Sequence, residues 1–173
     1  MPSPIGHIVA GAAIGRAITP RKPAMLIACA ALAAAPDLDL VVPWMHRMGT
    51  HSVGAVALVT IVAIAVTGKV TKSIRRFAAR PGQVRLLVIV ALVTAYSSHL
   101  LLDWLAADPT PPRGLQIMWP FNSRWYISGL DVFRGTARRN IFTVQSMWIN
   151  ATAVAQELLI LGPIAWVVFR LRR

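Results

Sequence analysis

The stretch Leu86–Ala106 reads LLVIVALVTAYSSHLLLDWLA, and it decides the fold. It is apolar over about the 20 residues that a helix needs to cross a bilayer. Toward its end it carries His99 and Asp103, whose i, i+4 spacing puts both side chains on one helix face. Membrane helices exclude ionisable side chains that have neither a partner nor a function. The stretch therefore predicts a transmembrane helix with either a metal-binding His–Asp pair or a His–Asp hydrogen bond.

Four other apolar segments accompany it. Ser52–Gly68 and Met147–Phe169 are long enough to span a bilayer. Pro4–Ile18 and Ala24–Ala35 are each only about 20 Å long at 1.5 Å per residue, so they are either tilted spans or a re-entrant hairpin. The first contains a GxxxG pattern at Gly11–Gly15, which either allows another helix to approach closely or arises by chance in a segment rich in alanine and glycine. We expect an all-α, multi-pass transmembrane helical bundle of about five membrane helices, the first two short.

The composition supports a membrane protein. The 173 residues are enough for one domain, residues 1–173, and 56% of them are hydrophobic while 14% are charged. That leaves too little polar surface for a soluble domain. The segment from about 107 to 146 differs, because it is rich in proline and polar residues, and we expect an extramembrane excursion there. Four of its aromatic residues, Trp119, Phe121, Trp125 and Tyr126, are typical of interfacial anchors.

The charge distribution predicts the orientation. The net charge is +12, and the basic residues lie mainly in clusters between apolar segments, as in juxtamembrane loops. Aromatic residues are not interleaved with these clusters, so we expect no nucleic-acid partner. A topology with the N-terminus outside and the C-terminus inside puts 12 of the 18 Lys and Arg residues in the cytoplasm. These clusters are Arg16/Arg21/Lys22, Lys69/Lys72/Arg75/Arg76/Arg80/Arg85 and Arg170/Arg172/Arg173.

With this topology, every histidine maps to the outer face of the membrane, together with three acidic residues that lie at or near helix ends. Such convergence of scarce ionisable side chains predicts a metal site there. Glu157 lies in the last apolar segment and has no evident partner. The converging residues are His7, Asp37, Asp39, His46, His51, His99 and Asp103.

Two short motifs suggest how Asp37, Asp39 and Arg47 could take part in this site. In the turn Pro36–Asp39, two carboxylates one residue apart suit a divalent cation, although helix-capping Asp residues explain such a turn as well. We expect Asp37 to be a ligand and Asp39 to be either a ligand or the general base. In the heptapeptide His46–Ser52, two histidines flank Arg47, which fits either phosphate binding by Arg47 or an interfacial polar loop.

The ordered motifs PIGH, PDLD, HRMGTHS, SHLLLDWL and WPF, over residues 4–121, resemble the YdjM-like family of metal-dependent hydrolases of the bacterial inner membrane. A more distant similarity is to the zinc-dependent phospholipase C and P1-nuclease group, all-helical enzymes that cleave phosphodiesters. This sequence lacks that group's N-terminal Trp and has no histidine after Asp103, so the resemblance implies one or two zinc ions and not three. The positions that match that group's zinc ligands are His7, Asp37, His51, His99 and Asp103.

The sequence thus predicts a membrane-bound phosphoesterase that acts on a lipid-linked or phospholipid substrate at the outer face. Arg47 would stabilise charge on the phosphoryl oxygens. The alternative is a non-catalytic metal-binding membrane protein, such as a carrier, a sensor or a structural partner. The sequence has neither the HExxH of a metalloprotease nor the GxSxG of a serine lipase. The expected ligands of the divalent metal, zinc, are His7, Asp37, His46, His51, His99 and Asp103.

Overall fold

A computed structural model describes residues 1–20, 22–41, 47–74, 80–138 and 140–172 of the chain. Over these residues the structure is all helical and contains no strand, only two isolated β-bridges. The all-α prediction is therefore confirmed. The helices are α1 (Pro4–Ile18), α2 (Pro23–Ala34), α3 (Val53–Ile74), α4 (Pro81–Trp104) and α5 (Val144–Leu171), with 3-10 helices η1 (Ala35–Val41) and η2 (Gly49–His51).

The two short helices pack tightly against each other. A Cβ atom added at Gly11 would lie 2.4 Å from the carbonyl oxygen of Cys29 and 2.6 Å from Cβ of Ala33, both in α2. At Gly15 it would lie 2.9 Å from Cα of Leu26. Only glycine permits so close a backbone approach, so the close packing expected from the GxxxG pattern is confirmed.

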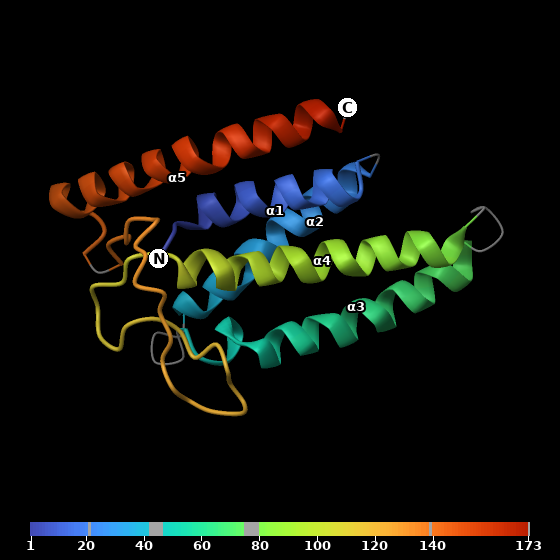
Figure 1. The fold of residues 1–173 in the computed structure, drawn as a ribbon, viewed down its shortest axis with the longest axis horizontal. Coiled ribbons are helices and arrows are strands. Elements are labelled where there is room, and N and C mark those ends of the chain that lie inside the picture. The colour runs from blue at the N-terminus through green and yellow to red at the C-terminus, as the bar shows by residue number, and fades with distance from the viewer. Residues whose placement is uncertain (21, 42–46, 75–79, 139, 173) are drawn as a thin grey trace.

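The helix α4 lies at the centre of the bundle, in contact with α1, α2 and α3, while α5 packs on α1 (Figure 1). Small buried residues let α2 and α4 come together: Cys29 and Ala33 from α2 pack with Ala91 and Ala95 from α4. This contact brings the C-terminal end of α2 beside the last two turns of α4, where His99 and Asp103 lie.

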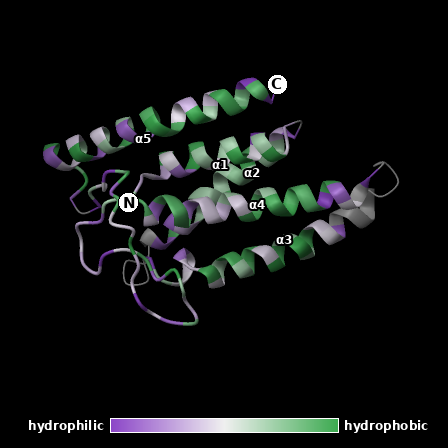
Figure 2. Cartoon of the chain, in the orientation of Figure 1, coloured by the Kyte–Doolittle hydropathy of each residue, from purple (hydrophilic) through white to green (hydrophobic). Residues whose placement is uncertain are grey.

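Two of the described helices are long and apolar enough to cross a membrane, α4 over Gly82–Trp104 and α5 over Val144–Leu171. Among the described residues this is fewer than the five membrane helices expected. The helix α1 has 15 residues and α2 has 12, so at 1.5 Å per residue both are shorter than the roughly 30 Å of a hydrocarbon core. The helix α3 has 22 residues, and its apolar part extends over Val53–Lys69. Figure 2 shows the hydrophobic residues of α4 and α5.

The excursion between α4 and α5 folds over one end of the bundle (Figure 1). A bridge between Ala106 and Phe133 ties it to the end of α4, and a second between Leu115 and Tyr126 joins two of its own segments. Leu115 is fully buried, and the carbonyl of Trp119 accepts a hydrogen bond of 3.0 Å from Gly54 N at the start of α3. The excursion is thus a packed cap over the end of the bundle where the expected site lies.

Candidate metal centre

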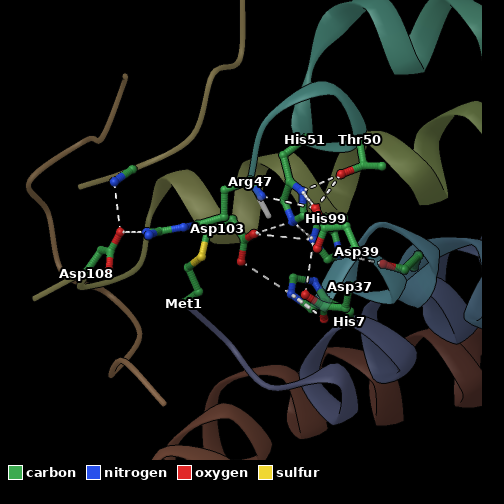
Figure 3. A network of polar contacts seen from close by, with 12 residues as sticks. Met1, His7, Asp37, Asp39, Arg47, Thr50, His51, His99, Asp103 and Asp108 are labelled. Atoms are coloured by element: carbon green, nitrogen blue, oxygen red, sulfur yellow. Dashed lines mark hydrogen bonds and ion pairs between the residues drawn. The ribbon is translucent and has the colours of Figure 1, made fainter. Parts of the chain in front are cut away.

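The residues expected to form the site that the structure describes come from four separate elements and meet beneath the cap (Figure 3). The first turn of α1 supplies one histidine, η1 supplies two carboxylates, η2 supplies a second histidine, and α4 supplies the His–Asp pair. His46 lies outside the described residues. The residues that the structure brings together are His7, Asp37, Asp39, His51, His99 and Asp103.

All of these side chains are buried. The three histidines are fully buried and Asp103 is 1% exposed, while the side chains of Asp37 and Asp39 are 10% and 6% exposed. Ionisable groups enter such an environment only when they are paired or bind an ion. Their burial indicates that these side chains pair with one another or bind an ion.

Asp103 occupies the middle of the cluster. One of its carboxylate oxygens faces two imidazole rings, and the other faces a third. Oδ2 lies 3.3 Å from Nε2 of His51 and 3.3 Å from Nε2 of His99. Oδ1 lies 3.4 Å from Nε2 of His7. The Nε2 atoms of His51 and His99 are 2.9 Å apart. Because three imidazole nitrogens point at one carboxylate, the arrangement resembles a set of metal ligands.

Two overlapping groups in the described residues could hold a metal ion. One consists of His51, His99 and Asp103, and the other of His7, Asp37 and His99; within each group the ligand atoms lie within 4.8 Å of one another. His99 belongs to both groups. Asp37 approaches it with Oδ1 at 3.8 Å from Nε2 and approaches His7 with Oδ2 at 4.0 Å from Nε2.

Contacts at Nδ1 determine that His51 and His99 direct Nε2 toward the centre of the cluster. Nδ1 of His99 donates to the carbonyl of Ala33 at 2.7 Å, which leaves Nε2 for a ligand. Nδ1 of His51 lies 3.2 Å from Oδ2 of Asp39 and 3.0 Å from Oγ1 of Thr50. A carboxylate or carbonyl behind a metal-binding imidazole is the usual arrangement, because it sets the tautomer and orients the ring. Asp39 is thus placed to orient His51.

Several polar atoms of the cluster are buried without a hydrogen-bond partner in the described part of the chain. They are both ring nitrogens of His7, Oδ2 of Asp37 and both carboxylate oxygens of Asp103. Leaving such atoms unpaired costs free energy. A cation among them would satisfy these atoms, so the donor set fits a metal ion.

Charge in the site also favours a cation. Burial lowers the pKa of His51, but the carboxylates of Asp103 and Asp39 outweigh burial and raise this pKa to about 9. The neighbouring carboxylates thus hold a positive charge on His51 in the protein alone. A metal ion would supply that charge in its place.

Arg47, expected to bind phosphate, has a carboxylate partner. Its guanidinium forms an ion pair with Asp108, which also accepts a hydrogen bond of 2.8 Å from Gly114 N. The backbone N–H of Arg47 donates to Oδ2 of Asp39 at 3.1 Å. The sequence analysis missed Asp108, although its position just after the apolar stretch that ends at Ala106 puts it at the same membrane face.

Glu157, for which the sequence offered no partner, is fully buried and bonded to Ser3. One carboxylate oxygen accepts from Ser3 N at 2.7 Å and the other from Ser3 Oγ at 2.5 Å. Ser3 is the N-cap residue of α1. A small polar residue at the start of a helix carries no signal in the sequence that would pair it with a distant carboxylate.

With the site geometry described, the relationship to known proteins can be stated. The chain matches the YdjM inner membrane protein family over residues 1–172. It belongs to this family. The resemblance of the ordered motifs is thereby confirmed, and membership together with α4 and α5 identifies a membrane protein. No curated protein and no solved structure matches the chain. The similarity to the phospholipase C and P1-nuclease group stays a prediction.

Proposed function

We propose that this YdjM-family protein is a membrane-bound, metal-dependent hydrolase, a phosphoesterase that acts on a lipid-linked or phospholipid substrate. One observation carries the proposal: three imidazole nitrogens surround the buried Asp103 carboxylate at 3.3–3.4 Å, and neither of its oxygens has a hydrogen bond of good geometry in the described structure. Such a centre fits a divalent ion better than it fits an internal hydrogen-bond network, which would satisfy these atoms.

Zinc suits the donors, since imidazole nitrogen and carboxylate oxygen are its common ligands. His51, His99 and Asp103 form the principal site, with His7 and Asp37 as further ligands. Because Nδ1 of His99 is bonded to Ala33, this imidazole can serve only one ion. A bound zinc ion would polarise a phosphoryl oxygen and lower the pKa of water.

Two further residues, Asp39 and Arg47, would assist the metal ion. Asp39 accepts hydrogen bonds from Thr50 Oγ1 at 2.6 Å and from Arg47 N, so orientation of His51 fits its contacts better than the expected role of general base. Arg47 would exchange its pairing with Asp108 for a substrate phosphate, as guanidinium binds either anion in the same bidentate manner.

The proposed substrate source is the outer leaflet. The site lies at one end of the bundle, and the C-terminal end of α1, the N-terminal end of α4 and the C-terminal end of α5 lie at the other (Figure 1). These helix ends carry Arg16, Arg85 and Arg170. The positive-inside rule assigns that basic end to the cytoplasm. The apolar side chains of Phe121 and Phe142, which are 85% and 89% exposed near the site end, fit contact with lipid.

A second candidate is a non-catalytic metal site, as in a sensor or a structural partner. The full burial of all three histidines favours it, because catalytic metal sites keep a position open to water or substrate. A carrier fits less well, since the ligands lie in the last turns of α4 and not near its middle.

The test is to purify the protein, measure its metal content, and assay headgroup release from phospholipid vesicles. His99→Ala should lose both metal and activity. Leu101→Ala, two residues further along the same helix and 53% exposed, should keep both. A metal-loaded wild type that releases nothing from any lipid class would favour the non-catalytic site. A wild type without metal would refute both candidates.

A further inference from the structure

The buried carboxylate of Glu157 has no part in the proposed chemistry, yet it is joined to the helix that carries His7. The helix α5 has few buried residues, namely Ser146, Ala153 and Glu157. Among these, Glu157 is the one ionisable group. Burying a carboxylate within a membrane helix is costly, so we expect Glu157 to have both a polar partner and a structural or functional role.

Its partner is the first turn of α1. The two bonds to Ser3 N and Ser3 Oγ satisfy both carboxylate oxygens. The first turn of α1 contains no acidic residue of its own, and helix N-termini favour negative charge because of their exposed N–H groups and the helix dipole. Glu157 therefore supplies this charge from another helix, across 154 positions of sequence.

Gly6 makes this contact possible. A Cβ atom at Gly6 would lie 2.7 Å from Oε2 of Glu157, so any side chain there would push the carboxylate away. Gly6 directly precedes His7. The contact with Glu157 thus fixes the backbone at the residue before a metal ligand.

His7 depends on its backbone more than the other histidines do. Nδ1 of His7 has no hydrogen-bond partner in the described chain, whereas Nδ1 of His51 contacts Asp39 and Nδ1 of His99 bonds the carbonyl of Ala33. Its ring stacks on that of His99, with centroids 3.7 Å apart. Stacking fixes the plane of the ring, but the position of the ring follows α1.

From these contacts we infer that Glu157 is a positioning residue for the metal centre: by bonding Ser3 and packing against Gly6, it holds His7 at its ligand position. This inference rests on the proposed metal-binding function. It assigns α5 a role in the site even though α5 contributes no ligand. Metal ligands tolerate displacements of about 0.2 Å, so a loose first turn of α1 would weaken the His7 side of the centre.

The test uses the full-length protein in detergent with Co²⁺ as the probe, because its visible spectrum reports on the ligands. The variants are Glu157→Ala, Glu157→Gln, His7→Ala, and Leu159→Ala as a control in α5, where that side chain is 76% exposed. Glu157→Ala should reproduce the spectrum of His7→Ala and weaken Co²⁺ binding about tenfold, the smaller effect typical of residues that orient ligands. Glu157→Gln can still bond Ser3 N and Ser3 Oγ, so it should retain the wild-type spectrum.

The inference is overturned if Glu157→Ala keeps the wild-type spectrum and affinity. It is also overturned if His7→Ala leaves the spectrum unchanged, since His7 would then be no ligand, while the group of His51, His99 and Asp103 would survive. Loss of all Co²⁺ binding in Glu157→Ala would assign it a general structural role instead. If Glu157→Ala is not recovered folded, Ser3→Ala replaces it, and the same outcomes decide. A wild type that binds no Co²⁺ would refute the proposed function itself.

Discussion

Adding one methyl group at Gly11 should damage both the helix pair and the metal centre. In Gly11→Ala, the new Cβ would lie 2.4 Å from a backbone oxygen of α2. Ordinary van der Waals contact begins at about 3.4 Å, so α1 must move away by about 1 Å. His7 is one turn from Gly11 on the same helix face, and a 1 Å shift far exceeds the roughly 0.2 Å that a metal–ligand distance tolerates.

The expected loss of stability is about 1–3 kcal/mol, the usual cost of overpacking. The replacement of glycine by alanine within a helix gains up to about 1 kcal/mol, so a matched control is needed. Gly162→Ala in α5 provides it, because a Cβ there meets no atom within 4 Å. Thermal unfolding in detergent and Co²⁺ titration measure the two effects.

Gly11→Ala should unfold at lower temperature than Gly162→Ala and bind Co²⁺ at least tenfold more weakly than the wild type. Equal melting temperatures and equal Co²⁺ affinities in the two variants would refute the argument. That result would mean that α1 and α2 do not approach as closely as described, or that His7 does not bind the metal.

Three further predictions concern the centre. A chelator should lower the melting temperature of the wild type, since metal at about 100 times its Kd stabilises the fold by about 2.7 kcal/mol. The melting temperature of His99→Ala should not change. An equal shift in both proteins would contradict a site at His99. Asp39→Asn should weaken metal binding about 10-fold to 100-fold in equilibrium titrations, because it removes the carboxylate behind His51; unchanged affinity would exclude the orienting role. Arg47→Ala should keep its metal, measured by elemental analysis, yet lose most headgroup release from vesicles; undiminished release would argue against phosphate binding by Arg47.

The sequence predicted the helices and the meeting of the site residues well, because both follow from local pattern and topology. The bounds of the first helix, Pro4–Ile18, agree with those of α1, since Ser3 and Pro4 are typical of a helix start. The convergence of His7, His51 and His99 followed from alternating the direction of successive helices. That inference needed only chain order and the lengths of apolar segments.

The partners of polar residues could not be predicted in the same way. Arg47 was expected to bind phosphate, but in the structure it pairs with Asp108, which lies 61 positions away. The sequence pattern carries no information about which distant carboxylate a given arginine contacts. The pairing of Glu157 with Ser3 was missed for the same reason. The described structure contains fewer helices of spanning length than expected, because α1 and α2 have only 15 and 12 residues.

The bond from His99 to the carbonyl of Ala33 has a consequence for the proline in the acidic turn. In the 3-10 turn that follows α2, the natural donor to this carbonyl would be the backbone N–H of residue 36, and Pro36 has none. The missing N–H leaves the carbonyl oxygen available to the imidazole. Pro36→Ala would introduce a backbone N–H that competes with His99 for that oxygen. Pro36 therefore helps to determine which ring nitrogen of His99 faces the ion.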